Sequence, residues 1–297
     1  MKPLDVLTLR LIVQTADSGS FTAAAEKSHL VLAAVSKRIQ EAEQSLGIKL
    51  FTRQSRGVIP TPAGHVIIKH ARTILDSLYR LGTDAQAFTA GLQGIVRIAA
   101  NTSAVCGYLP EEFAQFVVTN KNVQIDLDEV TSESVVNGIV AGQYDIGIIG
   151  ENEPHPGLET FRYRADFLSA VLPVAHPFAK HAQISFTVLQ QETFIGLEIG
   201  SSIHKLIRNH LGSQINLRMH VRSFDAMCRM VQAGLGVGIL PTHMALKHAA
   251  SMSVCVLPLS DEWAARHLLA CCTSTAALSA AASTFWQQLK AGVCLHD

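Results

Sequence analysis

The first sixty residues alternate between stretches of helical periodicity and short polar breaks. A first helix is predicted to end near Asp17, because apolar residues recur at helical spacing: Leu4, Leu7 and Leu11. A second helix is predicted at 21–28, and an amphipathic third helix begins near Leu32 and ends at Gly47. The last two are joined by a tight turn and the final one is basic, a pattern that is typical of a helix-turn-helix.

Two short apolar stretches surround a basic tip at 50–59, which predicts a hairpin wing. The third helix would enter the major groove, the wing would meet the backbone or minor groove, and Lys49 would add a phosphate contact. A solvated helix face and a basic loop would explain any one of these features, but not their ordered combination. The residues expected at DNA are Ser20, Thr22, Leu32, Ala33, Ala34, Ser36, Lys37, Arg38, Arg53 and Arg56.

At 62–88 only two glycines interrupt a helical pattern. Its apolar residues follow a heptad repeat, which predicts a helix, roughly 40 Å long, that pairs with another helix. A surface helix packed on its own chain is the alternative, but a helix-turn-helix needs a dimer in order to read two half-sites. The expected dimer seam consists of Ile67, Ala71, Ile74, Leu78, Leu81, Ala85 and Phe88.

The remaining two hundred residues alternate strand and helix patterns. Strands at 95–100, 123–130 and 145–149, with helices between them, form a βαβαβ order that favours a parallel sheet. A second series of strands is predicted at 169–173, 193–197, 217–221 and 237–240, with helices at 202–211 and from about Asp225. We expect two α/β lobes, lobe I at about 92–163 and 268–297, and lobe II at about 165–265.

The net charge is informative only when it is counted separately for the two parts of the chain. The 297 residues hold 24 Lys and Arg and 24 Asp and Glu, and an evenly spread net charge of zero would argue against a nucleic-acid partner. Residues 1–92, however, hold 11 basic and 7 acidic residues, a net charge of +4, and the rest carries −4. The neutral total therefore hides a basic segment that suits phosphate.

Composition excludes several other classes of protein. With 48% hydrophobic and 16% charged residues, the chain should fold rather than stay disordered. No secretory signal or long apolar segment is visible, so we expect a soluble, cytoplasmic protein with no membrane contact. The six cysteines lack CxxC spacing and are expected to be small buried hydrophobes, although a redox-sensing pair stays open.

Motifs for catalysis are missing from the sequence. GxSxG, HExxH and P-loop patterns do not occur, and the glycines at 234, 236 and 238 follow a helix with the wrong spacing for a dinucleotide site. The histidine pairs His65/His70 and His243/His248 are five residues apart and so point to different helix faces. We therefore expect no enzyme activity, no cofactor and no metal.

An ordered set of residues covers the whole N-terminal region: Gly19-Ser20-Phe21-Thr22-x-Ala24-Ala25, Ala34-Val35-Ser36-Lys37-Arg38-Ile39-Gln40, Glu43-x-x-Leu46-Gly47, Leu50-Phe51-x-Arg53-x-x-Arg56-Gly57-Val58 and Thr61-Pro62-Ala63-Gly64. This set resembles the DNA-binding region of the LysR-type transcriptional regulators. That family usually opens its recognition helix with Ser-Gln-Pro, whereas this chain has Val31-Leu32-Ala33. Val31 cannot cap the helix, a loss of about 1 kcal/mol. Leu32 cannot contact adenine as Gln does, so we expect it to touch a thymine methyl and shift the operator preference.

A second set of residues marks the C-terminal region: Gly94-x-Val96-Arg97-Ile98, Leu109-Pro110, Val136, Gly138, Gly142-x-x-Asp145-x-Gly147-Ile148 and Val231-x-Ala233-Gly234-x-Gly236-Val237-Gly238-Ile239-Leu240-Pro241. It resembles the effector domain of the same family, a two-lobed α/β domain like a type 2 periplasmic solute-binding protein. The resemblance implies a winged helix-turn-helix domain at 1–62, a linker and dimerisation helix at 63–90 and an effector-binding domain at 91–297. It also implies a dimer of dimers, of which the sequence itself shows the dimer seam.

In a two-lobed α/β domain the ligand lies in the crevice at the carboxyl ends of the strands. Hydroxyls and N–H groups at helix starts favour an anion there, so a carboxylate-bearing effector is expected, although a helix cap is the commoner explanation for each single hydroxyl. No arginine in these loops occupies a clear ligand position of the family, which leaves a neutral effector open. The expected effector-binding residues are Asn101, Thr102, Ser103, Val130, Thr131, Ile149, Gly200, Ser201, Ser202 and Phe224.

Together these patterns predict a sequence-specific DNA-binding transcriptional regulator that senses a small molecule in its C-terminal cleft. Its expected partners are double-stranded operator DNA with two half-sites, the effector, and further copies of the chain. Closure of the cleft on its ligand would change the packing of subunits on DNA. Two alternatives stay open: a solute-binding or enzymatic α/β protein with an accessory N-terminal dimerisation domain, and a thiol-based redox regulator.

Overall fold

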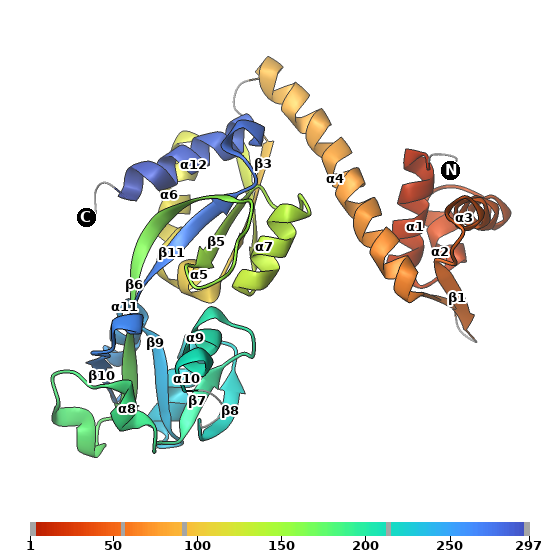
Figure 1. The fold of residues 1–297 in the computed structure, drawn as a ribbon. Coiled ribbons are helices and arrows are strands. Elements are labelled where there is room, and N and C mark those ends of the chain that lie inside the picture. Colours follow the sequence, from red (N-terminus) through yellow and green to blue (C-terminus); the bar gives the residue numbers. More distant parts are fainter. Residues whose placement is uncertain (1–3, 55–56, 91–93, 212–214, 294–297) are drawn as a thin grey trace. The chain divides into compact units, whose positions relative to one another are not determined.

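The computed structural model describes residues 4–54, 57–90, 94–211 and 215–293 (Figure 1). The chain divides into two compact units, Met1–Ala85 and Gln86–Asp297, and each has its own hydrophobic core. Separate cores make the two units distinct domains. Among the described helices, none is long and apolar enough to cross a membrane.

The N-terminal unit is a helical domain with a two-stranded wing, which confirms the predicted fold. Its core joins residues from all three of the first helices, among them Leu11, Ile12, Val35 and Ile39, each exposed by 2% or less. In chain order the elements are α1 (Val6–Ser18), α2 (Phe21–Lys27), α3 (Leu32–Leu46), β1 (Phe51–Gln54) and β2 (Gly57–Pro60).

The wing is held against the turn that follows α1. The backbone N–H of Val58 donates to the carbonyl oxygen of Gly19 at 2.8 Å. Gly57 has a φ of +97°, and a Cβ at this position would lie 2.3 Å from the same oxygen. Only glycine fits so close to another backbone, and the position of β2 depends on it.

The long helix α4 (Pro62–Ala90) follows the wing. Its first turns belong to the N-terminal unit, where Ile67 packs against the core and Ala71 is 1% exposed. Further along, α4 leaves apolar side chains exposed at heptad spacing: Ile74, Leu78, Leu81 and Ala85. The side chain of Phe88 lies outside the described residues.

The C-terminal unit is built on one sheet, nine-stranded in the part of the chain that the structure describes. β3 (Gly94–Ala100) pairs in parallel with β4 (Val123–Glu129) and β5 (Ile146–Gly150), as the βαβαβ pattern predicts. In lobe II, β7 (Phe194–Leu197) pairs in parallel with β8 (Leu217–Val221) and β9 (Val237–Pro241). β6 (Glu159–Pro173), β11 (Ala265–Cys272) and β10 (Val254–Pro258) add antiparallel pairings.

Helices cover the sheet in both lobes (Figure 1). Lobe I carries α5 (Thr102–Gly107), α6 (Leu109–Thr119), α7 (Ser132–Val140) and the returning α12 (Ala280–Val293). Lobe II carries α8 (Phe186–Leu189), α9 (Ser202–Leu211), α10 (Phe224–Gln232) and α11 (Thr242–Ala249). Short 3-10 turns occupy Pro177–Lys180, Glu262–Ala264 and Thr275–Ala277.

One predicted strand is much longer in the structure, and several elements were missed. The predicted strand at 169–173 is only the second half of β6, a 15-residue strand that begins in lobe I and ends in lobe II. Its first half alternates polar and aromatic residues, which is the two-residue period of a half-buried strand, and the prediction overlooked this signal. α8, α11 and β10 were not predicted, and the single helix expected after β3 is divided into α5 and α6. Because β6 and β11 both cross the lobe boundary, they form the connection on which the cleft is built.

Candidate functional site

The start of α3 presents apolar side chains to solvent. Val31 occupies the N-cap position without a side-chain hydrogen bond to the helix, which confirms the predicted loss of a cap. Val31 is 71% and Leu32 47% exposed, and Ala33 is exposed as well. Side chains that are exposed at the start of a recognition helix are free to contact base edges.

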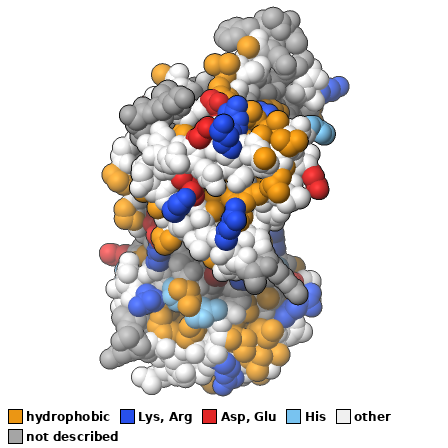
Figure 2. Space-filling model, turned by 90° about the vertical axis from the view of Figure 1, so that its right-hand side faces the viewer, with side chains coloured by type: hydrophobic (Ala, Val, Ile, Leu, Met, Phe, Trp, Pro, Cys, Tyr) orange, Lys and Arg blue, Asp and Glu red, His pale blue; other side chains and the backbone are white. Residues whose placement is uncertain are grey.

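The other residues expected at DNA differ in their exposure and in their contacts within the protein. Lys37 has a 77% exposed side chain, 4.0 Å from Glu41, and Arg53 is exposed on β1. Thr22 is exposed, Ala34 and Ser36 are half-buried, and Ser20 caps α2 by accepting from the N–H of Ala23 at 3.3 Å. Arg56 lies outside the described residues. On the face drawn in Figure 2, Lys and Arg side chains lie between patches of hydrophobic ones.

Arg38 is tied to α1. Its guanidinium donates to Asp5 at 2.8 Å and to the hydroxyl of Thr8 at 3.3 Å. Hydrogen bonds from Thr8, with that from Arg38, lower the pKa of Asp5 to about 2. Arg38 therefore links α3 to α1, and a phosphate contact would compete with this pair. Lys49 is engaged in a similar way, 2.6 Å from the buried Glu43.

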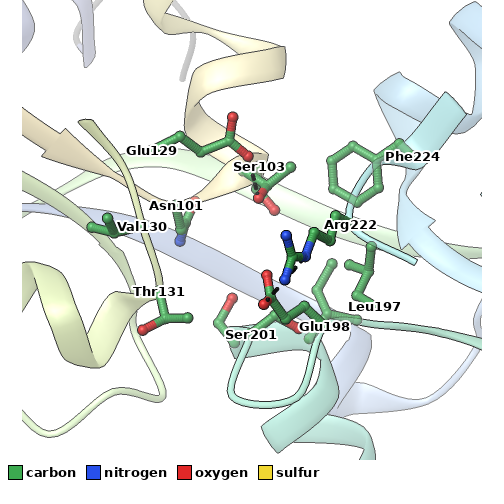
Figure 3. Close-up of a pocket in the computed structure, with 13 residues that line it drawn as sticks. Asn101, Ser103, Glu129, Val130, Thr131, Leu197, Glu198, Ser201, Arg222 and Phe224 are labelled. Carbon is green, nitrogen blue, oxygen red and sulfur yellow. Dashed lines mark hydrogen bonds and ion pairs between the residues drawn. The ribbon is translucent and has the colours of Figure 1, made fainter. Parts of the chain in front are cut away.

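A polar cavity of about 470 Å³ lies between the two lobes of the C-terminal unit (Figure 3). Lobe I contributes the ends of β3 and β4 and the residues that follow them, and lobe II contributes the corresponding segments after β7 and β8. The lining residues are Asn101, Thr102, Ser103, Glu129, Val130, Thr131, Leu197, Glu198, Ser201, Ser202, Ile203, Arg222 and Phe224. The carboxyl ends of parallel strands thus meet in one place, as the fold requires.

Most of the residues expected at the effector line this cavity: Asn101, Thr102, Ser103, Val130, Thr131, Ser201, Ser202 and Phe224. Two do not. Ile149 is fully buried in the core between β5 and α7. Gly200 forms the turn before α9 with a φ of +93° and is not among the lining residues.

Sequence reasoning missed the charged residues of the cleft. Arg222, directly after β8, lines the cavity, although no arginine was expected at a ligand position there. Glu129 is the last residue of β4, and Glu198 directly follows β7. Adding one residue on either side of each expected loop would therefore have included Arg222, Glu129 and Glu198. Leu197 and Ile203 add apolar surface.

Several polar groups of the cleft already have partners. The hydroxyl of Thr102 donates to Glu129 at 2.6 Å, and Arg222 lies 3.5 Å from Glu198. Asn101, Thr131 and Ser201 accept from backbone N–H groups of α5, α7 and α9 at 3.1 to 3.3 Å. These three side-chain oxygens cap helices, as the alternative explanation of such residues predicts. The cavity wall still carries negative and positive side chains, namely those of Glu129, Glu198 and Arg222.

Ion pairs and a ring contact join the lobes around the cavity. Lys205 on α9 contacts Glu133 of α7 at 2.9 Å and the buried Glu153 at 3.0 Å. On the opposite side of the boundary, Tyr108 and His243 lie with ring centroids 4.6 Å apart. Each of these contacts takes one residue from each lobe, so their geometry depends on how far the cleft is closed.

Four cysteines of the described part of the chain are held in surroundings that raise their pKa values. No group of three His, Cys, Asp or Glu residues there could hold a metal ion. Burial raises the pKa of Cys106, and it raises those of Cys228 and Cys272 to about 11 and that of Cys271 to about 12. Thiols with raised pKa values are poor nucleophiles at neutral pH.

A winged helix-turn-helix unit followed by a two-lobed unit with a polar cleft defines a class of protein, the ligand-responsive DNA-binding regulators. The family model "LysR substrate binding domain" matches residues 89–293, and "Bacterial regulatory helix-turn-helix protein, lysR family" matches residues 7–65. The chain belongs to the LysR family: it is a DNA-binding transcriptional regulator with a substrate-binding effector domain.

Relatives and solved structures agree with this assignment. A "Probable RuBisCO transcriptional regulator" of Trichormus variabilis is 32% identical over 81% of this chain and 74% of its own length. One of the same name from Cyanophora paradoxa is 30% identical over 80% of this chain and 76% of its own length. Full-length CbnR in complex with its target DNA shares the fold, with a TM-score of 0.73 at 19% identity, covering 97% of this chain and 99% of that one.

Proposed function

We propose that this regulator binds an operator of two half-sites and changes its occupancy of DNA when a small molecule fills the cleft. The observation that carries the proposal is the cavity itself, whose lining comes from both lobes. An effector that contacts both lobes binds the closed form more tightly than the open form, and so it shifts the equilibrium between the two forms. We assign DNA binding to 1–62, dimerisation to 63–90 and effector sensing to 91–297, in the cytoplasm where the chromosome lies.

The test combines DNA binding with a ligand screen on the full chain. Affinity for the DNA upstream of its own gene should fall steeply as salt rises, because phosphate contacts release counterions. Metabolites that raise the melting temperature should also change that affinity. Absence of binding at low salt would contradict the proposal.

For assembly we propose a dimer through α4, and a dimer of dimers in the complete regulator. Support comes from the exposed apolar residues Ile74, Leu78 and Leu81, which repeat at heptad spacing. Ile67 and Ala71, at the start of the predicted seam, pack within the N-terminal unit instead. The contact between copies would therefore be made by the second half of the helix.

For the effector we propose a small polar molecule, with a carboxylate as the first candidate. Arg222 and several hydroxyls support an anionic group, while Glu129 and Glu198 favour an effector that also carries donors. Stabilisation by cations alone in the ligand screen would overturn the carboxylate.

We also propose that the chain has no enzymatic activity of its own. This is supported by the family, whose named relatives are transcriptional regulators. The thiol-based alternative has less support, because burial raises the pKa of four cysteines. Unchanged DNA binding after oxidation is the expected result.

A further inference from the structure

The floor of the boundary between the lobes holds a buried ion pair that sequence reasoning did not single out. Asp166 on β6 and Arg266 on β11 face each other in the antiparallel register of the two strands that cross between the lobes. Arg266 is 3% exposed and Asp166 is fully buried, with Nη2 of Arg266 2.5 Å from Oδ2 of Asp166.

The guanidinium of Arg266 also reaches one serine from each lobe. Nη2 donates to the hydroxyl oxygen of Ser103 on α5, and Nη1 donates to that of Ser202 on α9, both at 3.0 Å. The two serines are 3% and 4% exposed, and both line the cavity. Arg266 therefore connects lobe I to lobe II through these two serines.

This contact determines what the serines can do. A guanidinium has only donors, so both serine oxygens accept from it and each hydroxyl proton is left to donate elsewhere. Within the described residues neither proton has a hydrogen-bond acceptor. Asp166 neutralises the charge of Arg266, so the guanidinium contributes orientation rather than net attraction.

We propose that Arg266 is a positioning residue that turns the hydroxyls of Ser103 and Ser202 into a pair of donors for one acceptor oxygen of the effector. An oxygen that receives both protons links lobe I to lobe II and favours the closed cleft. This inference rests on the proposed effector-binding role of the cleft, and it predicts that recognition depends on an acceptor group, such as a carboxylate or phosphate oxygen.

The experiment measures the affinity of the full-length protein for four probes by calorimetry: acetate, succinate, inorganic phosphate and 1,4-diaminobutane, which carries donors only. At least one acceptor probe should bind, and it should bind more tightly than the diamine. Ser103→Ala, Ser202→Ala and Arg266→Met should each raise the Kd of that probe by about tenfold or more, as expected for a hydrogen bond strengthened by a charge.

A double-mutant cycle separates positioning from a structural role. If Arg266 acts through the serines, Ser103→Ala should add little in the Arg266→Met background, whereas independent effects would add. Arg266→Lys, which keeps the charge but not the forked donors, should fold and still bind weakly. The double variant Arg266→Met/Asp166→Asn avoids a buried unpaired carboxylate if the single variant does not fold.

Arg164→Met is the matched control, because Arg164 forms another largely buried pair in the same unit, 2.7 Å from Glu112, and does not line the cleft. It should lower stability without changing the Kd of the probe. Binding of the diamine alone, additive effects of the serine and arginine variants, or no binding of any acceptor probe would each overturn the proposal. Affinity for the upstream DNA is measured on the same samples. If the protein binds this DNA, one of these outcomes overturns only the role of Arg266 and the two serines, whereas a loss of DNA binding would overturn the proposed function.

Discussion

Leu32 is 47% exposed at the start of α3, beside the uncapped Val31. An apolar side chain there can contact a thymine methyl but cannot donate to adenine. We predict that Leu32→Gln changes the preferred base at the contacted position from thymine to adenine, a discrimination of about 1–3 kcal/mol. Binding-site selection on the two proteins measures this.

Lys37→Ala is the control for that experiment. Lys37 has an exposed ammonium on the same helix, so its loss should weaken binding evenly across sequences and reduce the dependence on salt. Selection of adenine by the unchanged protein would show that Leu32 does not read this position.

Asp5 both caps α1 and pairs with Arg38. Its pKa is lowered from 3.8 to about 2 in the folded protein, so the carboxylate stabilises the fold above pH 4 and loses this effect as the pH falls through 2. Asp5→Ala should lower the free energy of unfolding by about 1 kcal/mol at pH 7. Urea unfolding of both proteins should show a difference that narrows below pH 4. A gap that stays constant down to pH 2 would exclude the ionised carboxylate as its cause.

At the scale of elements, sequence patterns predicted most of the helices and parallel strands because each has a regular pattern of buried apolar positions. The helix α3 buries one face and β5 is buried along its whole length, and the bounds of α3 and of β3 to β5 differ from prediction by a residue or so. The first half of β6 shows the two-residue alternation of a strand but contains few apolar residues, and its neighbours in the sheet come from distant parts of the chain. Local periodicity contains no information on such long-range pairing.

The second half of α4 exposes apolar side chains that its own unit does not cover. Leu78 is 42% exposed there, and in a dimer it would lie in the seam. We predict that Leu78→Asp dissociates the dimer, because a buried unpaired charge costs roughly 3–5 kcal/mol. Sedimentation velocity at micromolar concentration should show the change in mass. Ser77→Asp, one residue away and off the seam, should leave it intact, and dissociation of both variants or of neither would argue against this seam.

At the scale of the whole molecule, the position of the cleft was predictable and its electrostatics were not. The fold places loops after the strands at one crevice, so Ser103 and Ser202 were expected there. Arg266 was not, because it comes from a crossing strand, and only the pairing of β11 with β6 brings it between the lobes. Residues that act across a domain boundary have no local sequence pattern.

The ion pairs of Lys205 provide a test of how the lobes are held together. Burial alone would lower the pKa of Lys205, but hydrogen bonds to Glu133 and Glu153 outweigh it and raise the pKa, so the ammonium stays charged. Lys205→Met leaves Glu153, 5% exposed, without this partner. We predict that the lobes then open more often, with amide hydrogen exchange near 150–153 and 202–205 faster by about tenfold, the equivalent of ~1.4 kcal/mol.

Arg229→Met is the matched control for Lys205→Met. Arg229 also forms an ion pair in lobe II, 2.8 Å from Asp225, but both partners lie on α10 and the pair does not cross the boundary. Exposed pairs of this kind contribute little to stability. Exchange at the lobe boundary should therefore stay unchanged in Arg229→Met. Equal exchange in the two variants would mean that Lys205 does not restrain the lobes, and closure would then depend on the contacts of Arg266 and on the effector itself.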